Sequence, residues 1–318
     1  MLKGRVKNDK GVPVECKVCG RVLSDDTGLV KHITGMKDHP TIEEYRKYYS
    51  SDRKYYMDYI IPICNMGDDG FDYRLRNIES LIRIIPPFVN LIIVEQIVDT
   101  TRKLYTSNIR MPDKINIDKR IVRYDIFNKS WLYNIGVKLA RTDKILLAEG
   151  DINTNRLYFG DLFTYIYNGE GKNLDWFFAW DEIIYWDKEF KNKVRADSPR
   201  PGMAEGGVVY FNKDFYWKIG GANEWLQELG GIDNELAERS KFLSGYYIKF
   251  KWSINHLWHP ISHVKKEGWK YAKHRLNNRR IYYKVKSNPQ EMIDTLCKHN
   301  QEIGNSKNPI CKSIGLIL

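Results

Sequence analysis

The feature that most constrains the fold is an alternation, beginning after Tyr56, of short apolar runs with longer amphipathic segments. The apolar runs occupy residues 59–64, 91–94 and 144–148, and helical periodicity occupies residues 73–85 and 130–139. This alternation is typical of an α/β domain in which helices flank a mostly parallel sheet. Ligands bind such sheets beyond the carboxyl ends of the strands, so we expect the segments 65–69, 95–96 and 149–151 to converge on one crevice.

The last of these segments, Glu149-Gly150-Asp151, directly follows an apolar run. Two carboxylates separated by one residue can reach a single hard divalent cation, which in turn can hold a diphosphate and stabilise it as it leaves. An acidic turn after a strand is also common without any ion. The triplet by itself therefore permits metal chemistry without establishing it.

A separate motif near the N-terminus has the spacing Cys16-x2-Cys19-x12-His32-x6-His39. Two thiolates and two imidazoles form the ligand set of a closed tetrahedral Zn2+ site. The six residues between the histidines exceed the usual three to five, which makes His39 the least regular ligand. The motif resembles the C2H2 fingers of phage-encoded proteins and implies nucleic-acid binding. The alternative is a zinc knuckle that only stabilises the N-terminus or contacts protein.

The chain carries a net charge of +11, and the excess lies near its C-terminal end. Residues 265–318 hold 12 basic and 4 acidic residues, a difference of +8. Tryptophan and tyrosine residues are interleaved with these cations between positions 265 and 286. Such a stretch attracts phosphates and can stack on bases, although a solvated basic helix has the same composition. DNA is therefore a candidate partner.

The few cysteines and the short apolar segments indicate the cellular compartment of the protein. Five cysteines, two of them in one Cys-x2-Cys pair, favour metal binding in a reducing environment over a disulfide framework. No apolar stretch is long enough for a membrane span, and residues 1–10 lack the apolar region of a secretory signal. We expect a cytoplasmic protein, in the host cytoplasm if the chain is phage-encoded.

Several segments, taken in order, resemble a known family. They are "YIIPICN", "RLRNIESLIRI", "LIIVEQ", "FNKSWLYNIGVKLA", "ILLAEGDI", "GGVVYFNKDFYWKIGGANE", "LGGIDNELAERS" and "HLWHPISH". Together they resemble the GT-A glycosyltransferases, particularly the β-1,4-galactosyltransferases and the C-terminal region of the polypeptide N-acetylgalactosaminyltransferases. The resemblance implies a GT-A (Rossmann-like) fold with a mixed, mostly parallel sheet, and a UDP-sugar as donor.

The resemblance also implies roles for particular residues. Asp151 stands at the second acid of the family's Asp-x-Asp and would bind Mn2+ or Mg2+, with His256 and His259 completing the metal shell and His263 as a third choice. Asp233 stands at the family's catalytic base, which implies inversion. Ile232 replaces the family's glutamate and leaves the acceptor class open. The predicted donor-binding residues are Asn65, Arg74, Glu95, Asn128, Glu149, Gly206 and Gly207.

The sequence thus predicts a zinc finger with its following helix at residues 1–50, a glycosyltransferase domain at residues 51–264 and a basic aromatic extension at residues 265–318. The extension would pack on the catalytic domain or contact nucleic acid. The leading hypothesis is transfer of a hexose from a UDP-sugar to a hydroxymethylated pyrimidine in phage-type DNA. One alternative is a cytoplasmic transferase acting on a surface polysaccharide or a protein. Another is a non-catalytic DNA-binding protein with a degenerate transferase fold.

Overall fold

The structure is a computed structural model that describes residues 14–15, 22–23, 26–35, 55–65, 71–110, 117–199, 206–228, 230–259, 269–305 and 307–309. The chain divides into two compact units. The first comprises Met1–Lys54 and Asn155–Asn173, and the second comprises Tyr55–Thr154 and Leu174–Leu318. No helix among the described residues is long and apolar enough to cross a membrane.

The described residues of the first unit form an antiparallel strand pair and three helical segments. Its elements are β1 (Val14–Glu15), β2 (Val22–Leu23), α1 (Asp26–Gly35), α6 (Arg156–Asn168) and the 3-10 helix η1 (Glu170–Asn173). Of the four predicted zinc ligands, His32 lies in α1. Cys16, Cys19 and His39 lie outside the described residues, as does His263. The zinc site therefore stays a prediction.

The second unit is built on a six-stranded sheet. Its strands, in spatial order, are β5 (Ile117–Arg123), β4 (Val89–Ile97), β3 (Met57–Cys64), β6 (Lys144–Ala148), β11 (Val208–Asn212) and β8 (Trp176–Phe178). The first four run parallel, and β11 runs antiparallel to both of its neighbours. The sheet is thus mixed and mostly parallel, as predicted from the buried apolar runs.

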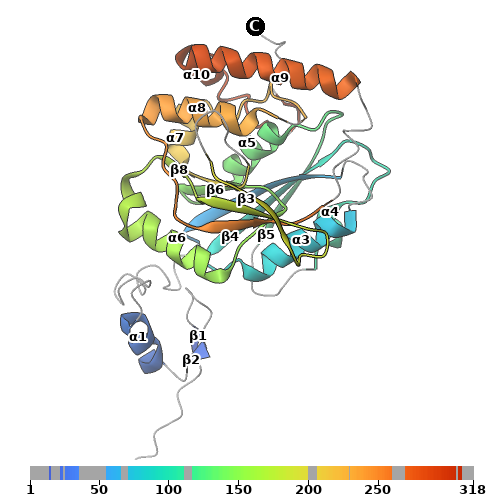
Figure 1. Cartoon of the computed structure of the whole chain (residues 1–318). Coiled ribbons are helices and arrows are strands. Elements are labelled where there is room, and N and C mark those ends of the chain that lie inside the picture. The colour runs from blue at the N-terminus through green and yellow to red at the C-terminus, as the bar shows by residue number, and fades with distance from the viewer. Residues whose placement is uncertain are drawn as a thin grey trace, which may run out of the picture. The chain divides into compact units, whose positions relative to one another are not determined.

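Helices cover both faces of this sheet (Figure 1). The helices of the unit are α3 (Phe71–Ile84), α4 (Tyr105–Asn108), α5 (Lys129–Leu139), α7 (Lys213–Lys218), α8 (Ile232–Ser244), α9 (Trp269–Ser287) and α10 (Pro289–Cys297). Successive side chains of β3 alternate between the faces. Ile60 lies against α5, whereas Ile61 and Ile63 lie on the side of Ile78 in α3. The predicted strands and helices are confirmed, with boundaries displaced by at most three residues.

A second, four-stranded sheet was not predicted. Its strands, in spatial order, are β10 (Lys193–Asp197), β9 (Glu182–Trp186), β12 (Ser253–His256) and β7 (Ile152–Asn153). β7 follows β6 after the Glu149-Gly150-Asp151 turn and pairs antiparallel with β12. This small sheet therefore brings the region around residue 256 back to the end of the central strand β6.

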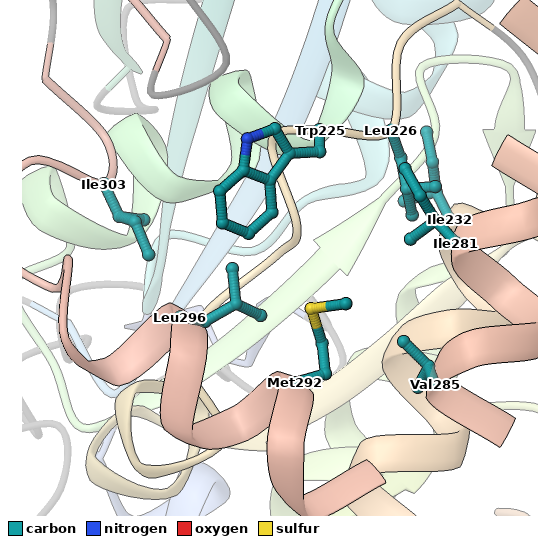
Figure 2. Close-up of a cluster of buried hydrophobic side chains, with 8 residues drawn as sticks. All are labelled: Trp225, Leu226, Ile232, Ile281, Val285, Met292, Leu296 and Ile303. Atoms are coloured by element: carbon teal, nitrogen blue, oxygen red, sulfur yellow. The ribbon is translucent and has the colours of Figure 1, made fainter. Parts of the chain in front are cut away.

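The C-terminal helices α9 and α10 pack on α8 and form a further layer of the α/β unit (Figure 1). A buried apolar cluster joins them to α8 and to the segment before it, as Figure 2 shows. Its members are Trp225, Leu226, Ile232, Ile281, Val285, Met292, Leu296 and Ile303. Burying these side chains stabilises the layer by roughly 1.5–3 kcal/mol for each large apolar side chain. The described part of the predicted extension is thus packed onto the α/β domain.

Candidate functional site

The site begins where β6 ends and the chain turns through Glu149, Gly150 and Asp151 into β7. The register of β7 with β12 pairs Ile152 with His256, and the Leu257 amide donates to the Asp151 carbonyl over 2.8 Å. These backbone bonds fix the segment 256–259 beside Asp151. The meeting of one carboxylate with two histidines is thus a consequence of sheet pairing.

Asp151, His256 and His259 form the site's candidate metal centre. One ligand atom from each lies within 4.8 Å of the others, and no other such group of three occurs among the described residues. His259 Nε2 is 2.7 Å from Asp151 Oδ2, and His256 Nε2 is 3.8 Å from the same oxygen. The second carboxylate oxygen, Oδ1, is buried and has no hydrogen-bond partner among the described residues.

The donor set and this orphaned oxygen fit a divalent cation. A buried carboxylate oxygen without a partner is costly unless an ion or a water satisfies it. Imidazole nitrogen with carboxylate oxygen suits Mn2+ or Zn2+ better than Mg2+, which prefers oxygen alone. Burial alone would raise the pKa of Asp151, but the adjacent His256 and His259 outweigh it and hold this pKa well below its usual range. The carboxylate is therefore ionised and available as a ligand.

Aromatic contacts hold the two histidines in place. The ring of Tyr185 in β9 stacks on His256 with centroids 4.7 Å apart, and the Arg195 guanidinium lies 4.0 Å from the centre of the Tyr185 ring. Trp258 meets Tyr73 of α3 edge to face, with centroids 4.9 Å apart. Neighbouring rings on both sides thus restrict the segment that carries both imidazoles.

A buried lysine, Lys129, lies between the first acid of the triplet and the predicted base. Its Nζ is 2.6 Å from Glu149 Oε1 and 3.2 Å from Asp233 Oδ1. The Lys129 side chain is only 9% exposed, against 28% for Glu149 and 27% for Asp233. Burial would lower the pKa of Lys129, but the two carboxylates outweigh it and raise this pKa well above its ordinary value. The ammonium therefore ties α5, the β6 turn and α8 together.

The pKa of Glu149 is raised, chiefly by burial and further by the nearby Asp151 and Asp233, while Lys129 acts in the opposite direction. The backbone opposite this carboxylate is glycine for a steric reason. The Glu149 amide donates to the Gly207 carbonyl over 3.2 Å, and a Cβ at Gly206 would overlap the Glu149 carboxyl group. Gly207 has a φ of 125°, and a Cβ there would come 2.7 Å from the Trp180 indole nitrogen. Both predicted glycines thus adjoin the acidic turn.

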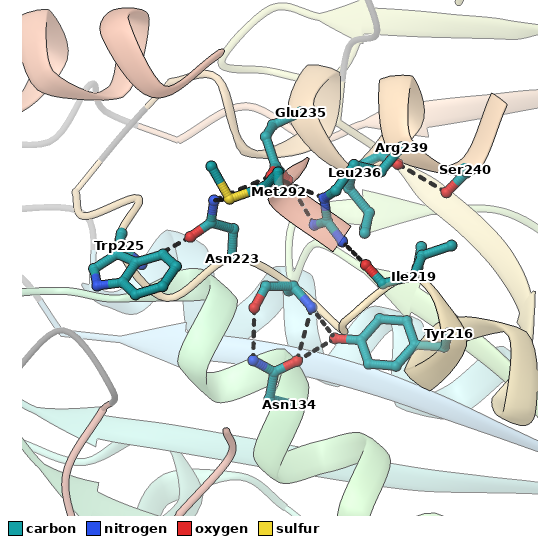
Figure 3. A network of polar contacts seen from close by, with 11 residues as sticks. Asn134, Tyr216, Ile219, Asn223, Trp225, Glu235, Leu236, Arg239, Ser240 and Met292 are labelled. Carbon is teal, nitrogen blue, oxygen red and sulfur yellow. Dashed lines mark hydrogen bonds and ion pairs between the residues drawn. The ribbon is translucent and has the colours of Figure 1, made fainter. Parts of the chain in front are cut away.

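Asp233 lies in the first turn of α8, where the helix dipole favours a carboxylate. A buried polar network fixes this helix (Figure 3). Glu235 and Arg239 are both fully buried and paired at 2.7 Å, and Asn223 donates to Glu235 over 3.0 Å. Asn134 of α5 holds the neighbouring loop by donating to the Ala222 carbonyl over 2.7 Å. The predicted base is thus positioned by a rigid surround.

The remaining predicted donor residues divide into two groups. Arg74 of α3 is close enough to Asp151 to lower its pKa. The side-chain amide of Asn65, at the end of β3, donates to the Lys103 carbonyl over 2.9 Å. Both lie at the predicted edge of the sheet and stay candidates for donor binding.

Glu95 and Asn128 instead have structural partners. Both carboxylate oxygens of Glu95 accept bonds from the first turn of α4, including 2.7 Å from the Tyr105 amide. Asn128 caps α5 by accepting from the Trp131 amide over 2.9 Å and donates to the Glu224 carbonyl over 2.7 Å. Both side chains are fully buried. Because these bonds occupy their polar atoms, neither residue is carried into the donor site proposed below.

Comparisons with known proteins bear on the fold. The sequence matches no protein-family model and no curated protein sequence. Among solved structures, GalNAc-T7 with UDP, GalNAc and Mn2+ matches with a TM-score of 0.51 and 14% identity. That match covers 83% of this chain and 57% of the other, so this chain spans little more than half the length of that protein.

Two further matches have lower TM-scores. S. aureus TarS 1-349 in complex with UDP-GlcNAc matches with a TM-score of 0.48 and 11% identity over 77% of this chain and 71% of that one. The mannosyltransferase PcManGT from Pyrobaculum calidifontis, in complex with GDP-Man and Mn2+, matches with a TM-score of 0.43 and 10% identity over 86% and 81%. The fold predicted from the sequence is confirmed: the α/β unit has the GT-A glycosyltransferase fold.

Proposed function

We propose that the chain is a metal-dependent glycosyltransferase that moves a sugar from a nucleoside diphosphate sugar to an acceptor hydroxyl. The proposed donor is a UDP-sugar. The observation that carries this proposal is the convergence of Asp151, His256 and His259 at the carboxyl end of β6. In an open α/β sheet this is the edge at which ligands bind. The GT-A fold agrees with the proposal but does not establish it.

These three residues would hold the divalent cation, which when bound supplies positive charge beside the donor diphosphate. Arg74 adds a second positive charge on the same side. Gly206 and Gly207, the predicted donor-binding glycines, keep this backbone next to the acidic turn, because a Cβ at either position would overlap Glu149 or Trp180.

Asp233 is the proposed base. Its carboxylate would take the proton of the acceptor hydroxyl as that oxygen forms a bond to the anomeric carbon. The bond from the anomeric carbon to the phosphate oxygen breaks in the same step, and its electron pair leaves with the nucleoside diphosphate. A single displacement of this kind inverts the anomeric configuration. The Lys129 ammonium, 3.2 Å from Asp233 Oδ1, would orient this carboxylate toward the triplet.

For the acceptor we propose a hydroxymethylated pyrimidine base in DNA. The spacing of Cys16, Cys19, His32 and His39 and the basic C-terminal segment support this choice. A base inside a duplex would have to be extruded to reach Asp233. A polysaccharide or protein acceptor is the alternative, and the replacement of the family's glutamate by Ile232 leaves both open.

The full-length protein, supplied with Mn2+ and a panel of UDP-sugars, tests the donor reaction through release of UDP. We expect release to require the metal and to be lost in Asp151→Asn. Asp214→Asn, which changes an exposed aspartate of α7, is the matched control. Release that is independent of metal, or equal in both variants, would overturn the assignment. Mass spectrometry of hydroxymethylated DNA, saccharide and peptide mixtures then identifies the acceptor, and labelling of saccharide or peptide alone would refute the DNA proposal.

A further inference from the structure

Helix α9 has an unusual composition for a helix packed in a core. Its nineteen residues include seven lysines and arginines and no aspartate or glutamate. Carboxylates on the neighbouring elements neutralise little of this positive charge. Among the described residues, Lys284 pairs with Glu291 of α10 at 3.1 Å, and no carboxylate lies within ion-pair distance of Arg275, Arg279, Arg280 or Lys286. These four side chains therefore concentrate positive charge on the described part of the helix, where no carboxylate pairs with them.

The two faces of α9 differ sharply. Asn278, Ile281 and Val285 are buried against α8 and α10, as Figure 2 shows for the two apolar residues. The opposite face is exposed and follows the three-to-four residue spacing of a helical stripe. It consists of Arg275, Leu276, Arg279, Arg280, Tyr283 and Lys286. We call these six residues the α9 cationic face.

The packing of α9 distinguishes between possible anionic partners. A helix that lies on a membrane buries an apolar face among the acyl chains. The apolar side of α9 is already enclosed in the protein core, and among the described side chains of the helix, residues 274–287, the large apolar or aromatic ones that remain exposed are Leu276 and Tyr283. A polymer of phosphates needs no apolar face, and an exposed tyrosine between arginines can stack on a base. The face therefore suits nucleic acid better than lipid.

The buried side of α9 is bonded to the segment that precedes the proposed base. Asn278 Nδ2 donates to the Gln227 carbonyl over 2.7 Å and to the Gly230 carbonyl over 3.0 Å. Its Oδ1 accepts from the Gln227 amide over 3.3 Å. Gly230 is three residues before Asp233. A helix is about 10–12 Å across with its side chains, so a polymer bound on α9 would lie within roughly that distance of the loop.

We propose that the α9 cationic face is the docking surface for the phosphodiester backbone of a nucleic-acid acceptor, and that Asn278 links this surface to the loop before Asp233. The proposal deepens the proposed function, on which it rests, by naming where the acceptor binds. Arg275 and Lys286 are separated by about 16 Å along the helix axis at 1.5 Å per residue. A face of this length can contact several successive phosphates of one strand along a groove of the duplex.

The number of cations sets the size of the effect. Each phosphate neutralised on duplex DNA contributes about −0.9 to the slope of log affinity against log salt concentration. Four cations on the face therefore contribute about −3.6 to the slope, and removing them should make the slope less negative by about 3.6. The loss should be nearly independent of sequence, because these contacts reach the backbone and not the base edges.

The test titrates the full chain into a short fluorescein-labelled DNA duplex and follows anisotropy at several salt concentrations. The test variant carries Arg275→Gln, Arg279→Gln, Arg280→Gln and Lys286→Gln. The matched control carries Arg110→Gln, Arg120→Gln, Arg123→Gln and Lys218→Gln, which are exposed cations of the same number on other elements. Both variants have the same net charge, so a difference between them reports position alone.

We expect the α9 variant to lose affinity at least tenfold and to show the reduced slope, while the control keeps both. A variant with lysine at the three α9 arginine positions should retain most of the binding, which separates loss of charge from misfolding. Equal binding by the α9 variant and the control would overturn the proposal. So would binding to vesicles of phosphatidylglycerol and phosphatidylcholine without binding to DNA. UDP release by the unaltered protein is measured without DNA, so failure of the transferase proposal is seen separately.

Discussion

Replacing Lys129 by methionine removes the cation between Glu149 and Asp233 while keeping a side chain of similar length. Two partly buried carboxylates would then face each other without a counter-charge. Removing one partner of a buried ion pair typically lowers the free energy of unfolding by about 3–5 kcal/mol. Because Glu149 and Asp233 are each more than a quarter exposed, water relieves part of this cost. We expect a loss of about 2–3 kcal/mol in the free energy of unfolding.

A double-mutant cycle with Asp233→Asn isolates the pair. The two side chains are 3.2 Å apart, so the two substitutions should be non-additive by about 0.5–3 kcal/mol, with the double variant more stable than the sum of the single changes implies. Chemical denaturation measures these free energies, and Lys218→Met, at an exposed lysine, is the control. Additive effects would refute the claim that Lys129 compensates Asp233 in the folded protein.

The same variant separates positioning from folding. At a temperature where it is folded, Lys129→Met should lower kcat for transfer by at least about tenfold, equivalent to about 1.4 kcal/mol, with a smaller change in the KM of the donor. Lys129→Arg, which keeps the charge, should recover part of kcat. An unchanged kcat in the methionine variant would show that Lys129 has a structural role only.

Three further predictions concern Gly206, Arg239 and the pH dependence of the stabilisation by Lys129. Gly206→Ala should abolish UDP release and cost less stability than Lys129→Met, because its Cβ displaces the Glu149 carboxylate while Lys129 keeps its pair with Asp233; activity within a factor of two of the unaltered protein would contradict this. Arg239→Met should cost about 3–5 kcal/mol on chemical denaturation, because it leaves the Glu235 carboxylate buried without its partner, and a cost below about 1 kcal/mol would count against the network. Since the pKa of Lys129 is raised in the folded state, its stabilisation is fully present below pH 10.5 and is lost as the pH rises through the higher folded value. The difference in unfolding free energy between the unaltered protein and Lys129→Met should therefore be constant from about pH 7 to about pH 10.

Three strands of the central sheet, β3, β4 and β6, could be predicted from the sequence because they are buried on both faces. The predicted apolar runs form the middle of β3 and β4, whose ends also hold the buried polar residues Asp58, Asn90 and Glu95, and an acidic turn marks the end of β6. The smaller sheet could not be predicted in this way. β7 has two residues and β12 has four, which is too short for an alternating pattern to be distinguished.

The candidate site was predictable only in part, for related reasons. Asp151 and the two histidines were expected together from the resemblance, and the pairing of β7 with β12 supplies the physical reason. Lys129 was missed because a lysine in the first turn of a helix normally faces water. Its burial depends on Glu149 and Asp233, which are 20 and 104 positions away in the sequence.

Polar residues at strand ends and helix starts are the hardest to assign from the sequence. Glu95 lies near the carboxyl end of β4, and Asn128 precedes α5, as ligand-binding residues of such a sheet often do. A carboxylate or amide in these positions can equally satisfy the free N–H groups of a helix start. The choice between these roles depends on whether a helix begins nearby in space, as α4 does for Glu95, and the sequence does not show that.

Pulsed electron paramagnetic resonance on the protein with one equivalent of Mn2+ probes the ligands of the metal centre. We expect one tightly bound ion whose echo modulation shows two imidazole nitrogens, reduced to one by His256→Ala or by His259→Ala. Tight binding should be lost in Asp151→Asn. A bound ion without nitrogen modulation, or one whose spectrum is unchanged by all three substitutions, would contradict the assignment of Asp151, His256 and His259.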